Sequence, residues 1–215
     1  MYTFDSQIQY GTETQKTFSV EDVKNEPMLF NCDIETAARL GGTLTKEFLS
    51  ILPDDWKNSN DFIVDSRVHM LMPGFFPCIP GFHHDDVPRE REDGQPNYIN
   101  PSYRAEHVLM LVGDCCPTEF AIGESKFPEV PTGGKYYKVW HPMVVDKIKS
   151  GELISVSAPS NRLVFFNDRT WHQGVRAKKG GWRWFIRASR NTKRKPTNEL
   201  RRQVQVYLET PMEGW

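Results

Sequence analysis

The sequence has 215 residues, 38% hydrophobic and 26% charged, which suits one globular domain with a substantial core over 1–215. Its 27 basic and 28 acidic residues give a net charge of −1, which excludes a global electrostatic field for nucleic acid or an anionic membrane. No run approaches the roughly 18 apolar residues of a membrane span, and no signal-peptide pattern opens the chain. Four cysteines without CxxC spacing fit reduced thiols, so we expect a cytoplasmic protein.

The clearest helical pattern lies between residues 33 and 52. Apolar side chains recur there at spacings of three and four residues, Asp33 can cap the start, and Pro53 ends the pattern. Gly41 and Gly42 weaken the middle of this helix and can split it in two. We expect the apolar stripe to pack against a sheet.

From residue 62 onward, short apolar or alternating runs are separated by turn sequences rich in Gly, Pro, Asn and Asp. Seven such runs behind one or two helices predict a mainly β fold with supporting helices, as a sandwich, a barrel or a jelly roll. The runs are DFIVDSRVHMLM, AEHVLMLV, TEFAIG, KYYKVW, LISVS, RLVFFN and WRWFIRAS.

A basic cluster follows residue 189 and precedes the strand-like VQVYLE. A solvated face is the usual explanation for such a cluster. Nucleic acid remains open as a partner but is not favoured, because a surface that follows phosphates is usually more basic overall. The cluster consists of Arg190, Lys193, Arg194, Lys195, Arg201 and Arg202.

Two segments carry candidate metal ligands. The first is GFHHDD, residues 81–86, and the second is VFFNDRTWHQG, where His172 emerges beyond an apolar strand. Side chains two apart on a strand point to the same side, so His83 with Asp85, or His84 with Asp86, can share a metal with His172. Two histidines and one carboxylate suit non-haem Fe(II) with open positions for substrate and O2. The parity of the strand leaves both pairs open.

The remaining histidines receive no such role. His69 and His107 lie inside predicted strands, where a hydrogen-bonded structural histidine is the commoner case. His141 precedes Pro142 in a loop-like stretch.

The strand after His172 places Arg183, Arg187 and Ser189 on one face together with Phe185. An inward-facing arginine is costly unless an anion pairs with it, and a small dicarboxylate suits the planar guanidinium. We expect one of the two arginines to pair with an internal Asp or Glu instead.

GFHHDD, VFFNDRTWHQG and WRWFIRAS, in this order, resemble the Fe(II)/2-oxoglutarate-dependent dioxygenase superfamily over roughly residues 62–190. The resemblance implies a double-stranded β-helix (jelly-roll, cupin-like) core over 62–190, packed on the helix at 33–52, with 191–215 as a C-terminal extension. It also implies Fe(II), with 2-oxoglutarate and O2 as cosubstrates, and a hydroxylase that forms succinate and CO2.

The same resemblance implies roles for individual residues. His83, Asp85 and His172 are the expected ligands, because an aromatic or small apolar residue commonly precedes the ligating histidine and Phe82 fills that place; His84 with Asp86 is the alternative. Arg183 is expected to bind the C5 carboxylate of 2-oxoglutarate. The alternative is Arg187 with Ser189, since RAS resembles the Arg-x-Ser of some members.

Two other classes of protein compete with this interpretation. An HD-type metal-dependent phosphohydrolase would use His84 and Asp85 as its doublet, but its ligands lie on long helices, and prolines surround this doublet. A non-catalytic jelly-roll binding module would leave the arginines unexplained. The substrate is unidentified, because the polar loops expected at 87–104 and 123–135 suit a small molecule, a peptide side chain or a nucleobase.

Overall fold

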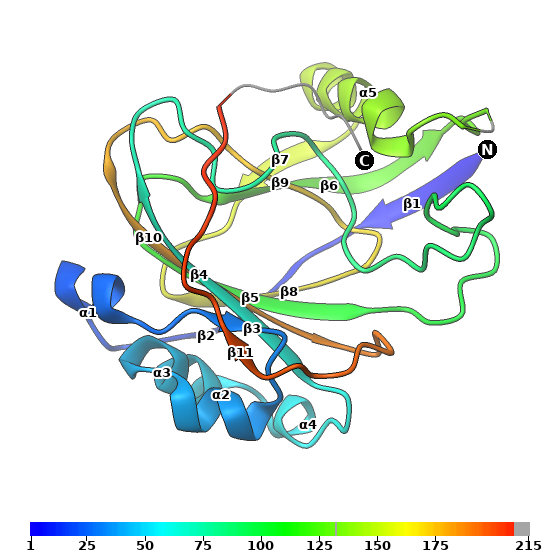
Figure 1. The fold of residues 1–215 in the computed structure, drawn as a ribbon. Coiled ribbons are helices and arrows are strands. Elements are labelled where there is room, and N and C mark those ends of the chain that lie inside the picture. The colour runs from blue at the N-terminus through cyan, green and yellow to red at the C-terminus, as the bar shows by residue number, and fades with distance from the viewer. Residues whose placement is uncertain (132, 209–215) are drawn as a thin grey trace.

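Two antiparallel sheets enclose a cavity in the computed structural model, which describes residues 1–131 and 133–208 (Figure 1). The predicted mainly β character with supporting helices is confirmed. The larger sheet has the strand order β2-β8-β5-β10-β4. Its strands are β2 (Gln9–Glu13), β4 (Ile63–Leu71), β5 (Glu106–Val112), β8 (Arg162–Asn167) and β10 (Gly181–Arg190).

Strand β10, which lies between β5 and β4, alternates between two environments. Trp184 and Ile186 are fully buried among the helices, whereas Arg183, Phe185 and Arg187 line the cavity on the opposite face. Because successive side chains of a strand point to opposite faces, β10 contributes to the hydrophobic core on one face and to the polar wall of the cavity on the other.

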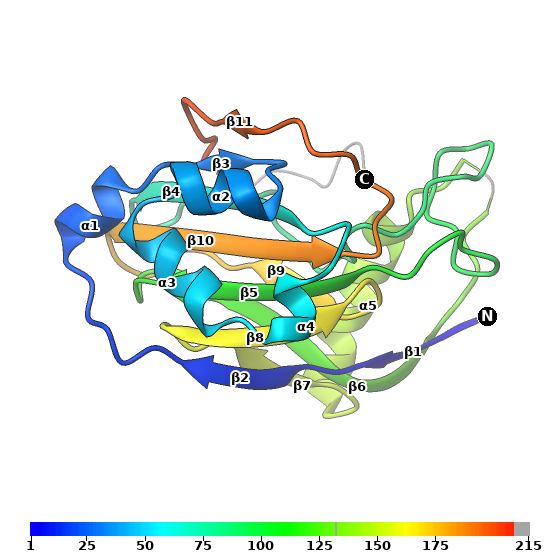
Figure 2. The ribbon, with the colours of Figure 1, turned by 90° about the horizontal axis from the view of Figure 1, so that it is seen from below.

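Four helices cover the outer face of the larger sheet (Figure 2). The helix expected over residues 33–52 is two helices, divided at Gly41 and Gly42. The buried carboxylate of Glu26 causes the second helix to begin there, because it accepts hydrogen bonds from the backbone N–H groups of Gly42, Leu44 and Thr45. The helices are α1 (Val20–Asn25), α2 (Ile34–Leu40), α3 (Thr43–Ile51) and α4 (Asp54–Lys57).

The smaller sheet is built on β6 (Thr118–Phe127), which pairs with β1, β7 and β9, and helix α5 packs against it. The prediction of a strand at KYYKVW was wrong, because these residues begin α5. Tyr137, Trp140 and Val144 bury one helical face at spacings of three and four, and Pro142 lies inside the helix. The elements are β1 (Tyr2–Ser6), β7 (Ile154–Ser157), β9 (Trp171–Gly174) and α5 (Tyr136–Ser150).

The C-terminal extension crosses the cavity between the two sheets (red in Figure 1). Its strand β11 (Glu199–Leu200) pairs with β3 (Leu29–Phe30), and Tyr207 forms a backbone bridge with Phe76. The prediction of a solvated basic face was wrong for Arg194 and Arg201, because both pair with Asp65 at 2.9 and 3.2 Å.

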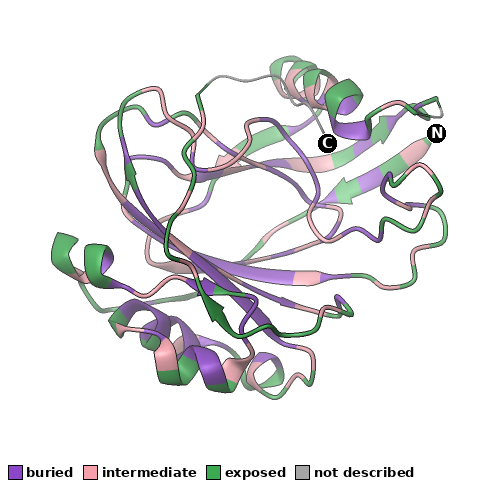
Figure 3. Cartoon of the chain, in the orientation of Figure 1, coloured by how far each residue is buried: buried purple, intermediate pink, exposed green. Residues whose placement is uncertain are grey.

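Burial follows this layering (Figure 3). The long strands of the larger sheet are mostly buried, whereas exposed residues gather on the helices and connecting loops. Within 1–131 and 133–208, no helix combines the length and the apolar character that a membrane crossing requires.

Candidate metal centre

His83 and His172 are held beside each other by their backbones. The N–H of His83 donates to the carbonyl of His172 at 3.0 Å, and the N–H of His172 donates back at 3.2 Å. This bridge joins the segment after β4 to strand β9 and places the two imidazole centroids 4.7 Å apart. The main chain therefore sets the separation of the two rings.

A hydrogen bond from the ring of each histidine to a backbone carbonyl fixes the tautomer of that ring. The Nδ1 atoms of His83 and His172 lie 2.8 and 2.9 Å from the backbone carbonyls of Gly81 and Thr170. Since a carbonyl only accepts, each Nδ1 carries the proton and each Nε2 keeps its lone pair for a metal. Burial, reinforced by the neighbouring His172, lowers the pKa of His83 to about 4, so this ring is neutral at pH 7.

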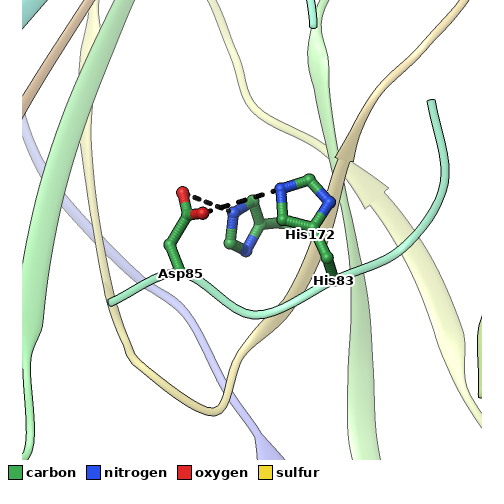
Figure 4. A group of neighbouring side chains, drawn as sticks. All are labelled: His83, Asp85 and His172. Carbon is green, nitrogen blue, oxygen red and sulfur yellow. Dashed lines mark hydrogen bonds and ion pairs between the residues drawn. The ribbon is translucent and has the colours of Figure 1, made fainter. Parts of the chain in front are cut away.

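Asp85 completes a group of three potential ligands (Figure 4). One ligand atom from each of His83, Asp85 and His172 lies within 4.8 Å of the other two. Nε2 of His172 is 3.2 Å from Oδ2 of Asp85, and Nε2 of His83 is 3.7 Å from Oδ1. With both Nδ1 atoms protonated, these facing atoms are all electron-pair donors, an arrangement that a bound cation stabilises. Two imidazoles and one carboxylate fit Fe(II).

Arg187 of strand β10 forms an ion pair with Asp85. Its guanidinium donates to the carboxylate of Asp85 and, at 3.3 Å, to that of Asp86. Burial alone would raise the pKa of Asp85, but the adjacent guanidinium of Arg187 holds it well below its usual range. The expectation that one of the two arginines pairs with an internal acid is confirmed for Arg187.

His84 points away from the group of three ligands, and Asp86 binds Arg187 without belonging to that group. Nδ1 of His84 lies 2.8 Å from the hydroxyl of Tyr98, and its ring packs on Trp171 with centroids 3.7 Å apart. Asp86 has a left-handed backbone, with φ of 52°. The geometry therefore favours the pair His83 and Asp85 over the pair His84 and Asp86.

Arg183 is a buried cation without an acidic partner among the described residues. Its Nε donates to the carbonyl of Cys116 at 2.7 Å and its Nη2 to the hydroxyl of Thr118 at 3.2 Å. Burial lowers its pKa. Ser189, in contrast, hydrogen-bonds to His107 at 2.9 Å and does not line the cavity.

A cavity of about 640 Å³ contains the ligand group and Arg183. Several other residues that line it were not predicted from the sequence. Strand β4 supplies Arg67 and His69, and the extension supplies Arg201. The polar loops expected to surround the site, at 87–104 and 123–135, contribute no described residue to its lining.

His141, given no role from the sequence, lies in α5 and acts next to the site. Its Nδ1 accepts a hydrogen bond from the backbone N–H of Phe82 at 2.9 Å. The helix thereby holds the segment that presents His83. The sequence signal missed was the helical spacing around Pro142.

Known proteins resemble this chain only distantly. No family model and no curated protein matches the sequence. Among solved structures, HygX from Streptomyces hygroscopicus with iron bound aligns with 12% identity and a TM-score of 0.38, over 86% of this chain and 82% of that chain. Apo HygX aligns with 12% identity and a TM-score of 0.39, over 86% and 81%. Scores this low give no basis for assigning a function, which depends on the site itself.

Proposed function

We propose that the protein is a non-haem Fe(II)- and 2-oxoglutarate-dependent dioxygenase that hydroxylates its substrate. One observation supports this most strongly: the unpaired, buried Arg183 shares a cavity with the group formed by His83, Asp85 and His172. A metal centre and a dicarboxylate anchor in one enclosure are the two parts that this chemistry requires.

The metal would be held by Nε2 of His83, Nε2 of His172 and the carboxylate of Asp85. When bound there, Fe(II) supplies the O2 activation that couples oxidative decarboxylation of 2-oxoglutarate, giving succinate and CO2, to substrate oxidation. Gly81 and Thr170 keep the two rings in the ligating tautomer, and Arg187 keeps Asp85 ionised.

Arg183 is the proposed anchor for the C5 carboxylate. Its burial excludes water, and its remaining guanidinium donors have no acid to bind among the described residues. Arg187 is the weaker candidate, because Asp85 and Asp86 already neutralise its charge. Ser189 is committed to His107 and supports neither role.

We further propose that the two sheets form a double-stranded β-helix. Support comes from the antiparallel pairing of β4, β10, β5 and β8 in one sheet and of β6 with β7 and β9 in the other. The open side between them holds the ligand group, as in that architecture.

The rival HD-type phosphohydrolase fits poorly. It needs His84 and Asp85 to act together from helices, but His84 points toward Tyr98 and residues 81–86 are in no helix. A non-catalytic binding module differs from the proposal only in turnover.

Catalytic turnover of 2-oxoglutarate therefore distinguishes the dioxygenase from a binding module. Wild-type protein with Fe(II), O2 and 2-oxoglutarate should form succinate slowly without added substrate, and 2-oxoglutarate should produce a visible charge-transfer band in the anaerobic Fe(II) protein. Arg183→Gln should bind the metal but require much more 2-oxoglutarate, whereas Arg202→Gln, an exposed arginine, should match wild type. If the wild type shows neither the band nor succinate, the proposal is wrong; the band without succinate would indicate a binding module.

A further inference from the structure

Arg67 is a second arginine of the cavity whose charge is not neutralised. It lies on β4 directly opposite Phe185 of β10, in the same face as Arg183 and Arg187. It is half-buried and forms no ion pair or hydrogen bond with the described residues. Arg183 is its diagonal neighbour on β10, opposite His69, and the two arginines project into the same cavity.

Arg201 approaches the same part of the cavity from the extension. Its Nη2 donates to Asp65 at 3.2 Å, but Asp65 also accepts from Arg194 at 2.9 Å. One carboxylate thus serves two guanidinium groups, and the buried Nε of Arg201 has no hydrogen-bond partner. Arg67 and Arg201 line the same cavity, and burial and then the charge of Arg67 lower the pKa of Arg201.

His69 adds a neutral hydrogen-bonding group beside them. It is only 1% exposed, and the backbone of Gln205 in the extension is the one polar neighbour that raises its pKa, although neither ring nitrogen makes a well-formed hydrogen bond among the described residues. Burial, together with the charges of Arg183 and Arg67, lowers its pKa to about 3, so at pH 7 the ring offers one N–H and one lone pair. A buried neutral imidazole next to two cations can donate its N–H to a bound anion.

The net charge of the cavity lining also favours a bound anion. Its described lining contains five arginines and three aspartates, and no lysine or glutamate, a net charge of +2. A divalent metal and the two carboxylates of 2-oxoglutarate cancel each other, so the proposed cosubstrate leaves this excess in place. Arg183 accounts for one of these two charges; the other falls on Arg67 together with Arg201, which shares Asp65 with Arg194.

We propose that Arg67 and Arg201, with His69 beside them, form an anion subsite, and that the substrate oxidised at the metal carries a carboxylate or phosphate group that binds there. The assignment of this anion to a substrate rests on the proposed dioxygenase function. Arg67 comes from the sheet and Arg201 from the extension, so the bound group would connect the two.

Inorganic phosphate and acetate are the probes, titrated by calorimetry into protein loaded with Mn(II) and 2-oxoglutarate. Wild type should bind at least one of them at a single site, and Arg67→Gln should weaken that binding about tenfold or more, equivalent to about 1.4 kcal/mol. Arg201→Gln should act in the same direction. Arg202→Gln removes the same charge one residue away from an exposed side chain and should change nothing.

Two further variants separate the possible failures. In Arg183→Gln the probe should still bind although 2-oxoglutarate binding is weakened; loss of probe binding here, with Arg67→Gln unaffected, would overturn the subsite. In His172→Ala the probe should also still bind; loss here alone would identify the probe as a metal ligand and overturn the subsite. No binding of either probe to wild type also overturns it. Failure of 2-oxoglutarate to bind wild type removes only the dioxygenase proposal, since phosphate and acetate binding is then measured without it.

Discussion

His83 and His84 are adjacent in the sequence and point in opposite directions. His83 faces Asp85 and His172 in the cavity, and His84 packs on Trp171 and contacts the hydroxyl of Tyr98. Both rings are buried, so exposure does not distinguish them. Only the direction of the side chain does.

The first prediction compares these two histidines. His83→Ala should lower the affinity for Fe(II) or Co(II) by more than about 100-fold, the upper range for losing a mere supporting partner of a ligand. His84→Ala should keep the metal and lose thermal stability instead, because it removes a stacked ring from a filled core. Metal content after desalting, with melting curves, measures both. Equal metal content in wild type and His83→Ala would contradict the assignment.

The second prediction concerns pH and His69. Folding lowers the pKa of this histidine from 6.5 to about 3, so the unfolded chain binds more protons between these values. Stability is therefore complete above pH 6.5 and declines as the pH falls toward 3; at pH 5 the loss is about 2 kcal/mol relative to pH 7. His69→Gln should flatten that part of the profile in urea unfolding of the metal-free protein. An unchanged slope would show that His69 titrates normally.

The third prediction concerns Glu26, which binds the start of α3. Its carboxylate, 5% exposed, accepts from three backbone N–H groups and from the Thr45 hydroxyl. Glu26→Ala should lower the free energy of unfolding by about 2–3 kcal/mol, since buried donors lose a charged acceptor. Glu21→Ala, which removes an exposed carboxylate from α1, should cost less than about 1 kcal/mol. Similar losses in the two variants would contradict this role.

The fourth prediction concerns the attachment of the extension. Arg194 joins it to Asp65, and Tyr207 joins it to Phe76 through the backbone. Arg194→Gln should speed hydrogen exchange at the Tyr207 amide roughly fivefold, since a partly exposed ion pair contributes about 1 kcal/mol. Arg202→Gln is the matched control. Equal exchange in both variants would mean that the extension is held independently of Asp65.

Much of the larger sheet could be predicted from the sequence, because its strands carry alternating or continuous apolar runs. WRWFIRAS is the clearest case, with a core face and an arginine face on one strand. Helix α5 was not predicted, because its aromatic first turn has strand-like composition and Pro142 obscures the helical spacing that surrounds it. Its burial depends on contacts with β6 and β1, which local sequence does not encode.

The candidate site shows the same division. Residue types and order pointed to His172 and to one of two histidine–aspartate pairs, but strand parity treats both pairs alike. The choice depends on the backbone bridge between His83 and His172, a long-range contact. Arg67 and Arg201 were missed as a pair for a related reason: the pairing of β3 with β11 and the ion pairs of Asp65, all long-range contacts, bring the extension to β4.

The backbone bridge has a consequence for how the protein would acquire its metal. Two reciprocal main-chain hydrogen bonds place the ligand-bearing segments, and carbonyl acceptors orient the rings, so folding rather than metal binding builds the site. Many metal sites form only as the ion draws loose ligands together, and there the ion is part of the folding reaction. Here the hydrogen bonds of the folded chain would position His83 and His172 before any metal binds. Under the proposed function, a metal ion could therefore be bound, removed or replaced after folding without unfolding the chain.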